Sequence, residues 1–557
     1  METGVRTRKT VTGGQAIVEC MKIEGVRECF CVPGESYLPL LDALYDEESI
    51  NLIAARHESG AAFMAEGYAK RALKPGIVMA TRGVGASNLS IGVHTAYQDS
   101  TPMVVFLGQV HSKNRGREGF QEIDLDQYFG HIAKWAVEVK DAARIAEITQ
   151  RAFRIAKTGR PGPVVVSLPE DILPRKAEMV FSPATVLPQP VPAKEEINHI
   201  KQLLSAAKKP LIIAGGGVKS AGAEEKLITF AEAYHLPVVA AFRRQDVFPN
   251  HHPLYAGHLG LGTNPRILKT VEEADTILAI GTRLSEVTTQ DYEIITPEKK
   301  LIHVDISFET IGKVFAPDAG IVADAGEALQ ALTDIGIQTS WQTWADERRR
   351  AFEEVSSLDV SHKDTIYKHI VALMEDILPD DAFLTNDAGN FAGWLHAYYP
   401  FKNKQTYTGP TSGAMGYGLP SAIGAKRAEP GKPVIALAGD GGFMMTMQEL
   451  ETAVRYQIPV ISIVFNNQMY GTIRMHQEMN YPEKVIGTDL GKVSFKGVAE
   501  SVGADGYLTN TPNEFAKALK QALSKNAPAV IEIMTEKEQI SVSSTISQLR
   551  DRAENKE

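Results

Sequence analysis

Cysteine is scarce in this chain of 557 residues, which contains only Cys20, Cys29 and Cys31. Three cysteines are too few for a disulfide framework, and they lack the second pair that a zinc site would need. Because Cys29 and Cys31 alternate within an apolar segment, we expect buried free thiols rather than a metal or redox site.

Long apolar runs are also absent from the sequence. No stretch reaches about 18 uninterrupted apolar residues, so we expect no membrane span. The opening segment METGVRTRKT carries charge and has no apolar core, so it does not have the pattern of a signal peptide. The sequence therefore predicts a cytoplasmic protein.

Basic residues are not in excess. The chain has 58 Lys and Arg against 68 Asp and Glu, which gives a net charge of −10. Binding to nucleic acids or acidic membranes needs clustered positive charge, so we expect neither partner. Hydrophobic residues make up 44% and charged residues 23%, as in a globular protein with a large core. Local features can still bind a small anionic cofactor.

Short apolar runs of strand length alternate with longer amphipathic segments along the whole chain. Examples are PMVVFLG, GPVVVSL, KPLIIAG, TILAIGT, KPVIALAG and IPVISIVF. This alternation predicts an α/β fold with mainly parallel sheets covered by helices on both faces. The Pro-rich segment 182–196 predicts a linker, and the charged helical segment from Trp344 predicts a bridge to the last unit. We therefore expect three doubly wound domains, at residues 1–185, 190–345 and 355–557.

The most informative stretch covers residues 434–472. It predicts one strand that ends at Gly439-Asp440-Gly441-Gly442, a helix containing Leu450 and Val454, and a second strand that ends at Asn466-Asn467. Ligands of open α/β sheets bind at the carboxyl ends of such strands. We expect the two strands to be neighbours, which would bring Asp440 close to Asn467.

This pairing of residue types is suited to a metal and a diphosphate. A carboxylate and a side-chain amide supply hard oxygen donors for Mg²⁺, which keeps positions open for phosphate oxygens. Gly441 and Gly442 would let backbone N–H groups approach a diphosphate at a helix start. A glycine turn and an Asn-Asn loop are each common alone, and it is their combination at this spacing that predicts a site.

The GDG-to-NN arrangement resembles the signature of thiamine diphosphate-dependent enzymes. The resemblance implies that Asp440, Asn467 and the main-chain carbonyl of Met469 hold the Mg²⁺ ion. It also implies the family fold, with a pyrimidine-binding first domain, a Rossmann-like middle domain and a diphosphate-binding last domain.

Further cofactor contacts follow from the same resemblance. In TSGAMGYGLPSAIGA, Met415 would be the apolar wedge that bends the cofactor, and the carbonyl of Gly413 would accept a hydrogen bond from its aminopyrimidine. Asn390 is expected among the cofactor-binding residues, together with Gly441 and Gly442.

Glu58 lies near the amino terminus, in ARHESGAAFMAEGYAK. An acid buried in an Ala-rich setting can serve as a proton donor, although this segment alone would suggest an exposed helix glutamate. The segment resembles the Arg-His-Glu element of the family, which implies that Glu58 activates the thiazolium carbon through the pyrimidine ring. Because Glu58 and Asp440 lie in different domains, the resemblance implies a homodimer or homotetramer with active sites between subunits.

Several further segments resemble the acetolactate synthase group, among them TRGVGASN, GFQEID and RPGPVVVSLPED. This resemblance implies a carboligase that decarboxylates a 2-oxo acid, such as pyruvate, and transfers the acyl carbanion to a second carbonyl. Phe120 and Gln121 match active-site residues of the group. Gln121 would orient the keto group of an acceptor, and an ordinary surface loop is the alternative.

Four departures separate the chain from that group. Glu35 stands where the synthases carry Gly. It would transfer protons and favour aldehyde release. The alternative is a glutamate that caps a helix or lies on the surface. Glu170 replaces a Lys. Residues 283–287 replace the Arg-Phe-Asp-Asp-Arg element near FAD, which puts FAD binding in doubt. His476 replaces a substrate-discriminating Trp, and it would bind an acceptor carboxylate or face solvent.

Three other functions remain open. The first is a 2-oxo acid decarboxylase that releases an aldehyde, although the paired histidines of pyruvate decarboxylases are absent from REGFQEID. The second is dinucleotide binding at the glycine loop 214–217, which lacks the full GxGxxG spacing. The third is a catalytically silent subunit, which would have no chemical need for Glu58, Asp440 and Asn467.

Overall fold

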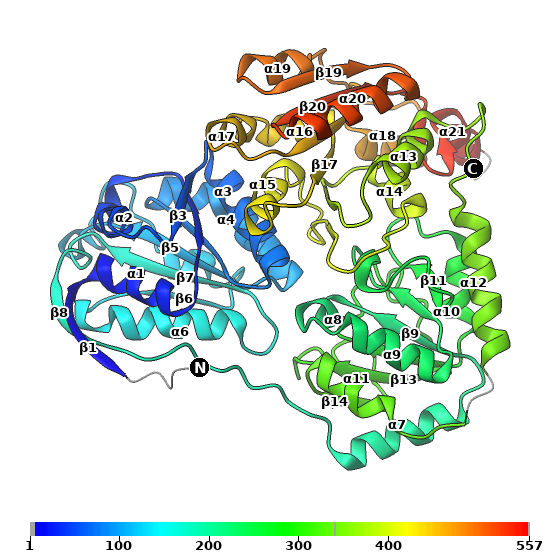
Figure 1. Ribbon diagram of the computed structural model, residues 1–557, viewed down its shortest axis with the longest axis horizontal. Coiled ribbons are helices and arrows are strands. Elements are labelled where there is room, and N and C mark those ends of the chain that lie inside the picture. The colour runs from blue at the N-terminus through cyan, green and yellow to red at the C-terminus, as the bar shows by residue number, and fades with distance from the viewer. Residues whose placement is uncertain (1–5, 339–340, 555–557) are drawn as a thin grey trace.

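Three six-stranded sheets make up the computed structural model, which describes residues 6–338 and 341–554 (Figure 1). Every strand pair within these three sheets is parallel, and helices cover both faces of each sheet. The predicted α/β class with three doubly wound units is confirmed. The fully apolar strands follow from this architecture, because a parallel sheet is buried on both faces.

The first sheet has the strand order β3-β2-β4-β5-β7-β6. Its strands are β2 (Glu28–Cys31), β3 (Asn51–Ala54), β4 (Gly76–Ala80), β5 (Met103–Gln109), β6 (Trp135–Glu138) and β7 (Pro163–Pro169). Its helices are α1 (Gly13–Ile23), α2 (Leu38–Tyr45), α3 (Glu58–Ala72), α4 (Gly83–Asp99), α5 (Leu125–Phe129) and α6 (Ile145–Lys157). An antiparallel pair, β1 (Thr7–Thr12) with β8 (Lys176–Phe181), completes this domain. The three cysteines are buried and free here, as expected.

The middle sheet has the order β11-β10-β9-β12-β13-β14, which is the strand order of dinucleotide-binding domains. Its strands are β9 (Pro210–Ala214), β10 (Val238–Ala240), β11 (Tyr255–His258), β12 (Thr276–Ile280), β13 (Lys300–Asp305) and β14 (Ala319–Val322). Its helices are α7 (Lys194–Ala206), α8 (Gly216–Ser220), α9 (Glu224–Tyr234), α10 (Pro265–Glu273) and α11 (Ala325–Thr333). The expected Rossmann-like topology is confirmed.

The charged segment after residue 341 forms α12 (Gln342–Ser356), which packs against the middle domain. Trp344 is buried in the core of that domain, and Arg349 donates to the main-chain carbonyls of Asn250 and His252. The division into 1–185, 190–345 and 355–557 stays a prediction, and these contacts favour a last boundary after Ser356.

The last sheet has the order β16-β15-β17-β18-β20-β19, the same permutation as the first sheet. Its strands are β15 (Phe383–Asn386), β16 (Tyr407–Thr408), β17 (Val434–Gly439), β18 (Ile461–Asn466), β19 (Asp505–Thr509) and β20 (Ala529–Met534). Its helices are α13 (Ile366–Ile377), α14 (Ala392–Tyr398), α15 (Gly418–Ala428), α16 (Asp440–Thr446), α17 (Glu449–Arg455), α18 (Gly471–Asn480), α19 (Phe495–Ser501), α20 (Pro512–Lys525) and α21 (Ile546–Glu554). The antiparallel hairpin β21 (Gln539–Ser541) and β22 (Ser544–Thr545) precedes α21.

The first and last domains share one apolar core, in which α3 packs against α15 (Figure 1). The two helices approach closely, because a Cβ atom on Gly424 would lie 1.9 Å from the main-chain oxygen of Met64. Tyr417 donates a hydrogen bond to the fully buried carboxylate of Glu66 at the same junction. These contacts fix the orientation of the two domains within one chain. None of the helices in the described part of the chain is both long enough and apolar enough to cross a membrane.

Candidate active site

The topological switch point of the last sheet lies between β15 and β17, from which β16 and β18 continue in opposite directions. Ligands of open α/β sheets bind outside the carboxyl ends of the strands at such a point. Asp387 follows β15, Asp440 follows β17 and Asn467 follows β18. The expected pairing of β17 with β18 is confirmed by their parallel register.

Asp440 is a buried carboxylate that is held by main-chain groups. It accepts the N–H of Gly441 at 2.9 Å, and the N–H groups of Gln468 and Met469, in the loop after β18, act to lower its pKa. Burial raises the pKa of Asp440 to about 6. Across the described ranges no Lys, Arg or His forms an ion pair with this carboxylate.

The segment between the two strands forms two helices rather than the single helix that we expected. The first helix ends at Thr446 and the second begins at Glu449, and the residues between them, Met447 and Gln448, keep right-handed helical dihedral angles. Leu450 is buried and Val454 is partly buried, so the apolar positions still face the core. The short α16 keeps Asp440 at its first position, directly beside the loop after β18.

Gly441 and Gly442 pack directly against neighbouring side chains. A Cβ on Gly442 would lie 2.3 Å from Asp387 Oδ2, and one on Gly441 would lie 2.5 Å from the ring of Tyr470. Packing within the chain therefore already requires glycine at both positions. Their contact with a diphosphate stays a prediction.

Asp387 was missed by the sequence analysis. It is 1% exposed and accepts the main-chain N–H groups of Gly416, at 3.0 Å, and of Gly418. Burial raises the pKa of Asp387 to about 6. The signal was present in the sequence, because an apolar strand is followed by Asn386-Asp387 before a glycine-containing turn.

The hydrogen bonds of Asp387 hold the loop that carries Gly413 and Met415. Gly413 has a positive φ of 74°, and its N–H donates to the carbonyl of Pro410 at 3.0 Å. Met415 is partly buried. This loop thus lies next to Gly442, and the cofactor contacts expected of Gly413 and Met415 stay predictions.

Asn390 and His476 differ in how firmly they are held. The side chain of Asn390 donates to the carbonyl of Ile540 at 2.8 Å and accepts from the hydroxyl of Thr472 at 2.9 Å. It therefore ties the start of α18 to the carboxyl-terminal hairpin. His476 lies on the exposed side of α18. A role for either residue in binding stays a prediction.

Glu58 begins α3 in the first domain, and His57 caps that helix. Glu58 is 8% exposed and accepts a hydrogen bond from Asn88 Nδ2 at 2.9 Å. A Cβ on Gly85 would lie 3.0 Å from Glu58 Oε1. The carboxylate therefore lies against the first turns of α4, which follow the switch point of the first sheet.

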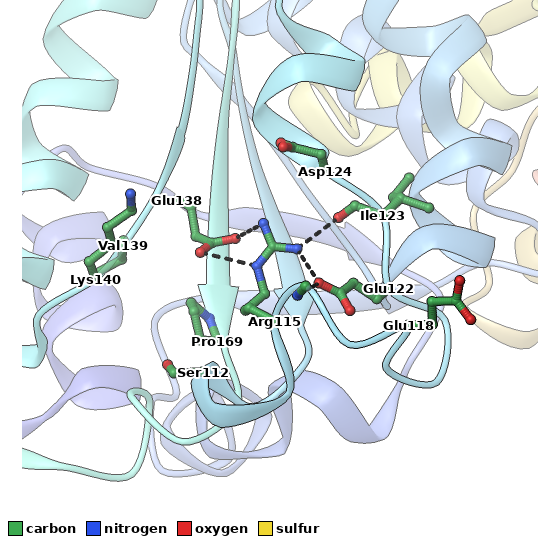
Figure 2. Close-up of a pocket in the computed structure, with 11 residues that line it drawn as sticks. Ser112, Arg115, Glu118, Glu122, Ile123, Asp124, Glu138, Val139, Lys140 and Pro169 are labelled. Atoms are coloured by element: carbon green, nitrogen blue, oxygen red, sulfur yellow. Dashed lines mark hydrogen bonds and ion pairs between the residues drawn. The ribbon is translucent and has the colours of Figure 1, made fainter.

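Arg115 braces the loop that carries the GFQEID motif (Figure 2). It donates to Glu122 at 2.8 Å and pairs with Glu138 at 2.9 Å. Glu122 also accepts the main-chain N–H groups of Gly116 and Gly119. The braced loop borders a cleft of about 860 Å³ at the carboxyl edge of the first sheet.

Phe120 and Gln121 lie at the tip of this loop with different exposure. Phe120 is 76% exposed. Gln121 has a positive φ of 64°, its carbonyl accepts the N–H of Gly83 at 3.0 Å, and its Oε1 is buried with no hydrogen-bond partner in the described structure. A buried acceptor without a donor is unfavourable, so the Gln121 side chain is suited to a ligand or a partner surface.

Two separate groups of candidate residues result. Glu35, Glu58 and Gln121 surround the start of α4, whereas Asp440, Asn467 and Met469 surround the start of α16. Within the described residues of one chain, no hydrogen bond or ion pair connects the two groups.

Three family profiles match the chain. They describe the thiamine pyrophosphate (TPP) enzyme N-terminal TPP binding domain over residues 11–128, the central domain over 197–332 and the C-terminal TPP binding domain over 387–533. A probable acetolactate synthase large subunit of Methanocaldococcus jannaschii is 34% identical, over 94% of this chain and 91% of its own length. The chain belongs to the thiamine pyrophosphate enzyme family.

Two further relatives of this thiamine pyrophosphate enzyme cover it equally well. The acetolactate synthase large subunit of Lactococcus lactis is 33% identical, over 96% of this chain and 94% of its own length. The acetolactate synthase isozyme 3 large subunit of Escherichia coli is 32% identical, over 92% of each chain. The predicted family resemblance is therefore confirmed along nearly the whole chain.

Proposed function

We propose that this thiamine pyrophosphate enzyme is a carboligase. It would remove CO₂ from a 2-oxo acid, with pyruvate as the first candidate, and join the remaining acyl unit to a second carbonyl compound. The relatives named acetolactate synthase support this choice. The observation that carries the proposal is the buried carboxylate of Asp440, which has main-chain donors around it and no cationic side chain paired with it in the described structure.

The residues around Asp440 fit a magnesium ion. No cluster of three or more His, Cys, Asp or Glu side chains that could hold a metal occurs in the described ranges, so such an ion would need amide and main-chain oxygens as well. Asn467 supplies a side-chain amide oxygen and Met469 a main-chain carbonyl, both on the loop after β18, in which the Met469 N–H donates to Asn467 Oδ1 at 3.2 Å. Mg²⁺ prefers such oxygens and accepts phosphate oxygens at its remaining positions. We assign Asp440, Asn467 and Met469 to the metal.

Thiamine pyrophosphate, when bound, supplies a carbon that adds to a carbonyl group and an electron sink for the loss of CO₂. Gly441, Gly442, Gly413, Met415 and Asn390 would hold it in the last domain. Glu58 would hold a proton on its carboxyl group and exchange it with the pyrimidine ring. Glu58 is buried, and in the described structure its carboxyl group accepts a side-chain hydrogen bond from Asn88.

The residues of the first domain would determine the fate of the acyl unit. Gln121 would orient the acceptor carbonyl, Phe120 would exclude water beside it, and His476 would contact an acceptor carboxylate. Glu35 favours the alternative outcome, a decarboxylase that releases an aldehyde, because a carboxyl group at this place can deliver a proton to the acyl carbon. Both outcomes share the same first step, and the products distinguish them.

We further propose that the active site is completed by a second copy of this chain, in a homodimer or homotetramer. Exposed apolar side chains flank both groups of candidate residues, with Val84 and Ile91 on α4 and Met444 and Met445 on α16. Contact between such surfaces would bury apolar area and bring Glu58 of one copy toward Asp440 of another.

The proposal includes no flavin. Arg283 donates to the main-chain carbonyl of Gln98 at 2.7 Å, and Leu284 is buried with a positive φ of 50°. The residues that replace the expected FAD-adjacent element are thus already engaged within the chain. The absorption spectrum of the purified protein tests this point, and flavin bands would contradict it.

The proposed function is tested by incubating the purified protein with thiamine pyrophosphate, Mg²⁺ and pyruvate and identifying the products by mass spectrometry. A ligated product supports the carboligase, and acetaldehyde without ligation supports the decarboxylase. The variant Asp440→Ala serves as the control, because it should lose Mg²⁺-dependent cofactor binding. Retained cofactor affinity in that variant would remove the metal assignment.

A further inference from the structure

The first sheet has the same kind of switch point as the last sheet. β2 and β4 are neighbours, and β3 and β5 continue the sheet in opposite directions from them. The turn after β2 carries Glu35, and the turn after β4 carries Arg82. Because ligands bind at such points, these two turns occupy in the first domain the position that Asp387 and Asp440 occupy in the last domain.

Arg82 is the centre of an ion-pair cluster at this switch point. Its Nη1 donates to Glu35 Oε1 at 2.9 Å, and its Nη2 donates to Glu170, which directly follows β7. The Arg82 side chain is buried, whereas 61% of the Glu35 side chain is exposed. The planar guanidinium can hold two carboxylates in fixed directions, which the single ammonium group of lysine cannot do.

The residues on either side of Arg82 contact the other candidate residues of the first domain. The hydroxyl oxygens of Ser36 and Thr81 lie 2.8 Å apart, so the two turns are joined a second time. A Cβ on Gly85 would lie 3.0 Å from both Thr81 Cγ2 and Glu58 Oε1. The segment from Thr81 to Gly85 thus connects the turn of Glu35 with Glu58.

We propose that Arg82 is a positioning residue, which holds Glu35 near Glu58 by anchoring it to Glu170. This inference rests on the first step of the proposed function, the loss of CO₂ from a 2-oxo acid, and concerns the alternative outcome, in which Glu35 donates the proton for aldehyde release. In that step CO₂ leaves the 2-oxo acid, the acyl carbon takes a proton from the Glu35 carboxyl group, and Glu35 regains a proton from water. Without Arg82, Glu35 Oε1 loses the hydrogen bond from the guanidinium that fixes its direction, so the Glu35 carboxyl group is no longer held toward the acyl carbon.

The ratio of aldehyde to ligated product tests this role in the holoenzyme, with thiamine pyrophosphate, Mg²⁺ and pyruvate. We expect Arg82→Met to lower the ratio about tenfold, which corresponds to about 1.4 kcal/mol. Glu35→Gln should lower it in the same way, and the double variant should lower it no further, because both changes remove one interaction. A wild-type ratio in Arg82→Met, or shifts that multiply in the double variant, would overturn the proposal.

Folding is followed by the melting midpoint of every variant. If Arg82→Met does not fold, Arg82→Lys replaces it, and the ratio should still fall because one ammonium group cannot hold both carboxylates. Arg8→Met is the matched control, since Arg8 pairs with Glu178 at 2.9 Å on an exposed surface of the same domain. A ratio shift in the control equal to that of Arg82→Met would also count against the proposal.

Failure of this inference differs from failure of the proposed function. If the wild-type holoenzyme releases no CO₂ from pyruvate or other 2-oxo acids, the proposed function is wrong and the role of Arg82 falls with it. If CO₂ and ligated product form but aldehyde does not, proton delivery by Glu35 and its positioning by Arg82 are overturned, while the carboligase stands.

Discussion

Replacing Gly442 by alanine has two opposite effects on the stability of the folded protein. Gly442 lies within α16, where alanine is favoured over glycine by roughly 0.5–1 kcal/mol on helix propensity alone. The added Cβ would, however, lie 2.3 Å from Asp387 Oδ2, so the buried Asp387 carboxylate has to move. We therefore expect Gly442→Ala to destabilise the protein, against the prediction from propensity.

The magnitude follows from the hydrogen bonds of Asp387. Its carboxylate accepts the main-chain N–H groups of Gly416 and Gly418, and a hydrogen bond to a charged group contributes about 1.5–3 kcal/mol. Loss of one such bond, offset by the helix gain, leaves a net destabilisation of about 0.5–2.5 kcal/mol. If the loop with Met415 holds the cofactor as proposed, cofactor affinity should fall by about 2-fold to 60-fold, at tenfold per 1.4 kcal/mol.

Chemical denaturation and titration with thiamine pyrophosphate at fixed Mg²⁺ measure the two quantities. Gly431→Ala is the matched control, because a Cβ at Gly431 meets no atom within 4 Å. Its stability and cofactor affinity should equal those of the wild type. A Gly442→Ala protein as stable as the control and with the same affinity would refute the argument from close packing.

Three further changes test other parts of the structure. Glu58→Gln should still bind the cofactor but lose most proton exchange at its reactive carbon, measured by deuterium exchange in NMR; an unaltered exchange rate would refute the role of Glu58. Arg550→Met removes the bidentate partner of the fully buried Glu478 and should cost about 1–3 kcal/mol in urea denaturation, whereas no change would show that the ion pair is dispensable. Burial raises the pKa of Glu449 to about 6 from an ordinary 4.5, so the folded protein binds this proton more tightly and its stability should fall by about 2 kcal/mol as pH rises from 4.5 to 6. Glu449→Gln should flatten that part of the profile of unfolding free energy against pH, and an unchanged slope would assign it to other groups.

The chemistry of the last domain could be predicted from the sequence because its residues are close in the chain. Asp440 and Asn467 each follow an apolar strand, and a single β-α-β crossover makes those strands neighbours. The sequence did not show that the crossover helix is broken into α16 and α17. Met447 and Gln448 keep helical dihedral angles, so only the helical hydrogen-bond pattern is interrupted there, and apolar spacing does not encode that pattern.

Contacts between distant segments could not be predicted in the same way. Glu35, Arg82 and Glu170 were visible as three separate charges, and two of them only as departures from a family pattern. Their common ion-pair cluster requires β2, β4 and β7 to end at one edge of the sheet, which depends on strand order. Glu449 likewise accepts the main-chain N–H groups just before Glu58 from another domain. No spacing in the sequence encodes that contact.

The repeated strand order gives a reason why the complete site would need two copies of the chain. α3 and α15 occupy equivalent positions in the first and last sheets, and within one chain they pack against each other. α4 and α16 are also equivalent, because each begins directly after the strand at its switch point. They carry exposed apolar residues and are not joined by hydrogen bonds in the described chain. In a twofold-symmetric dimer, α4 of each copy would pack on α16 of the other copy, as α3 packs on α15 within a chain. The same contact would therefore form twice. Each such contact would bring the carboxyl group of Glu58, at the start of α3, toward the proposed metal-binding loop of the other copy. A single chain would not bring the two together, because α3 is packed on its own α15.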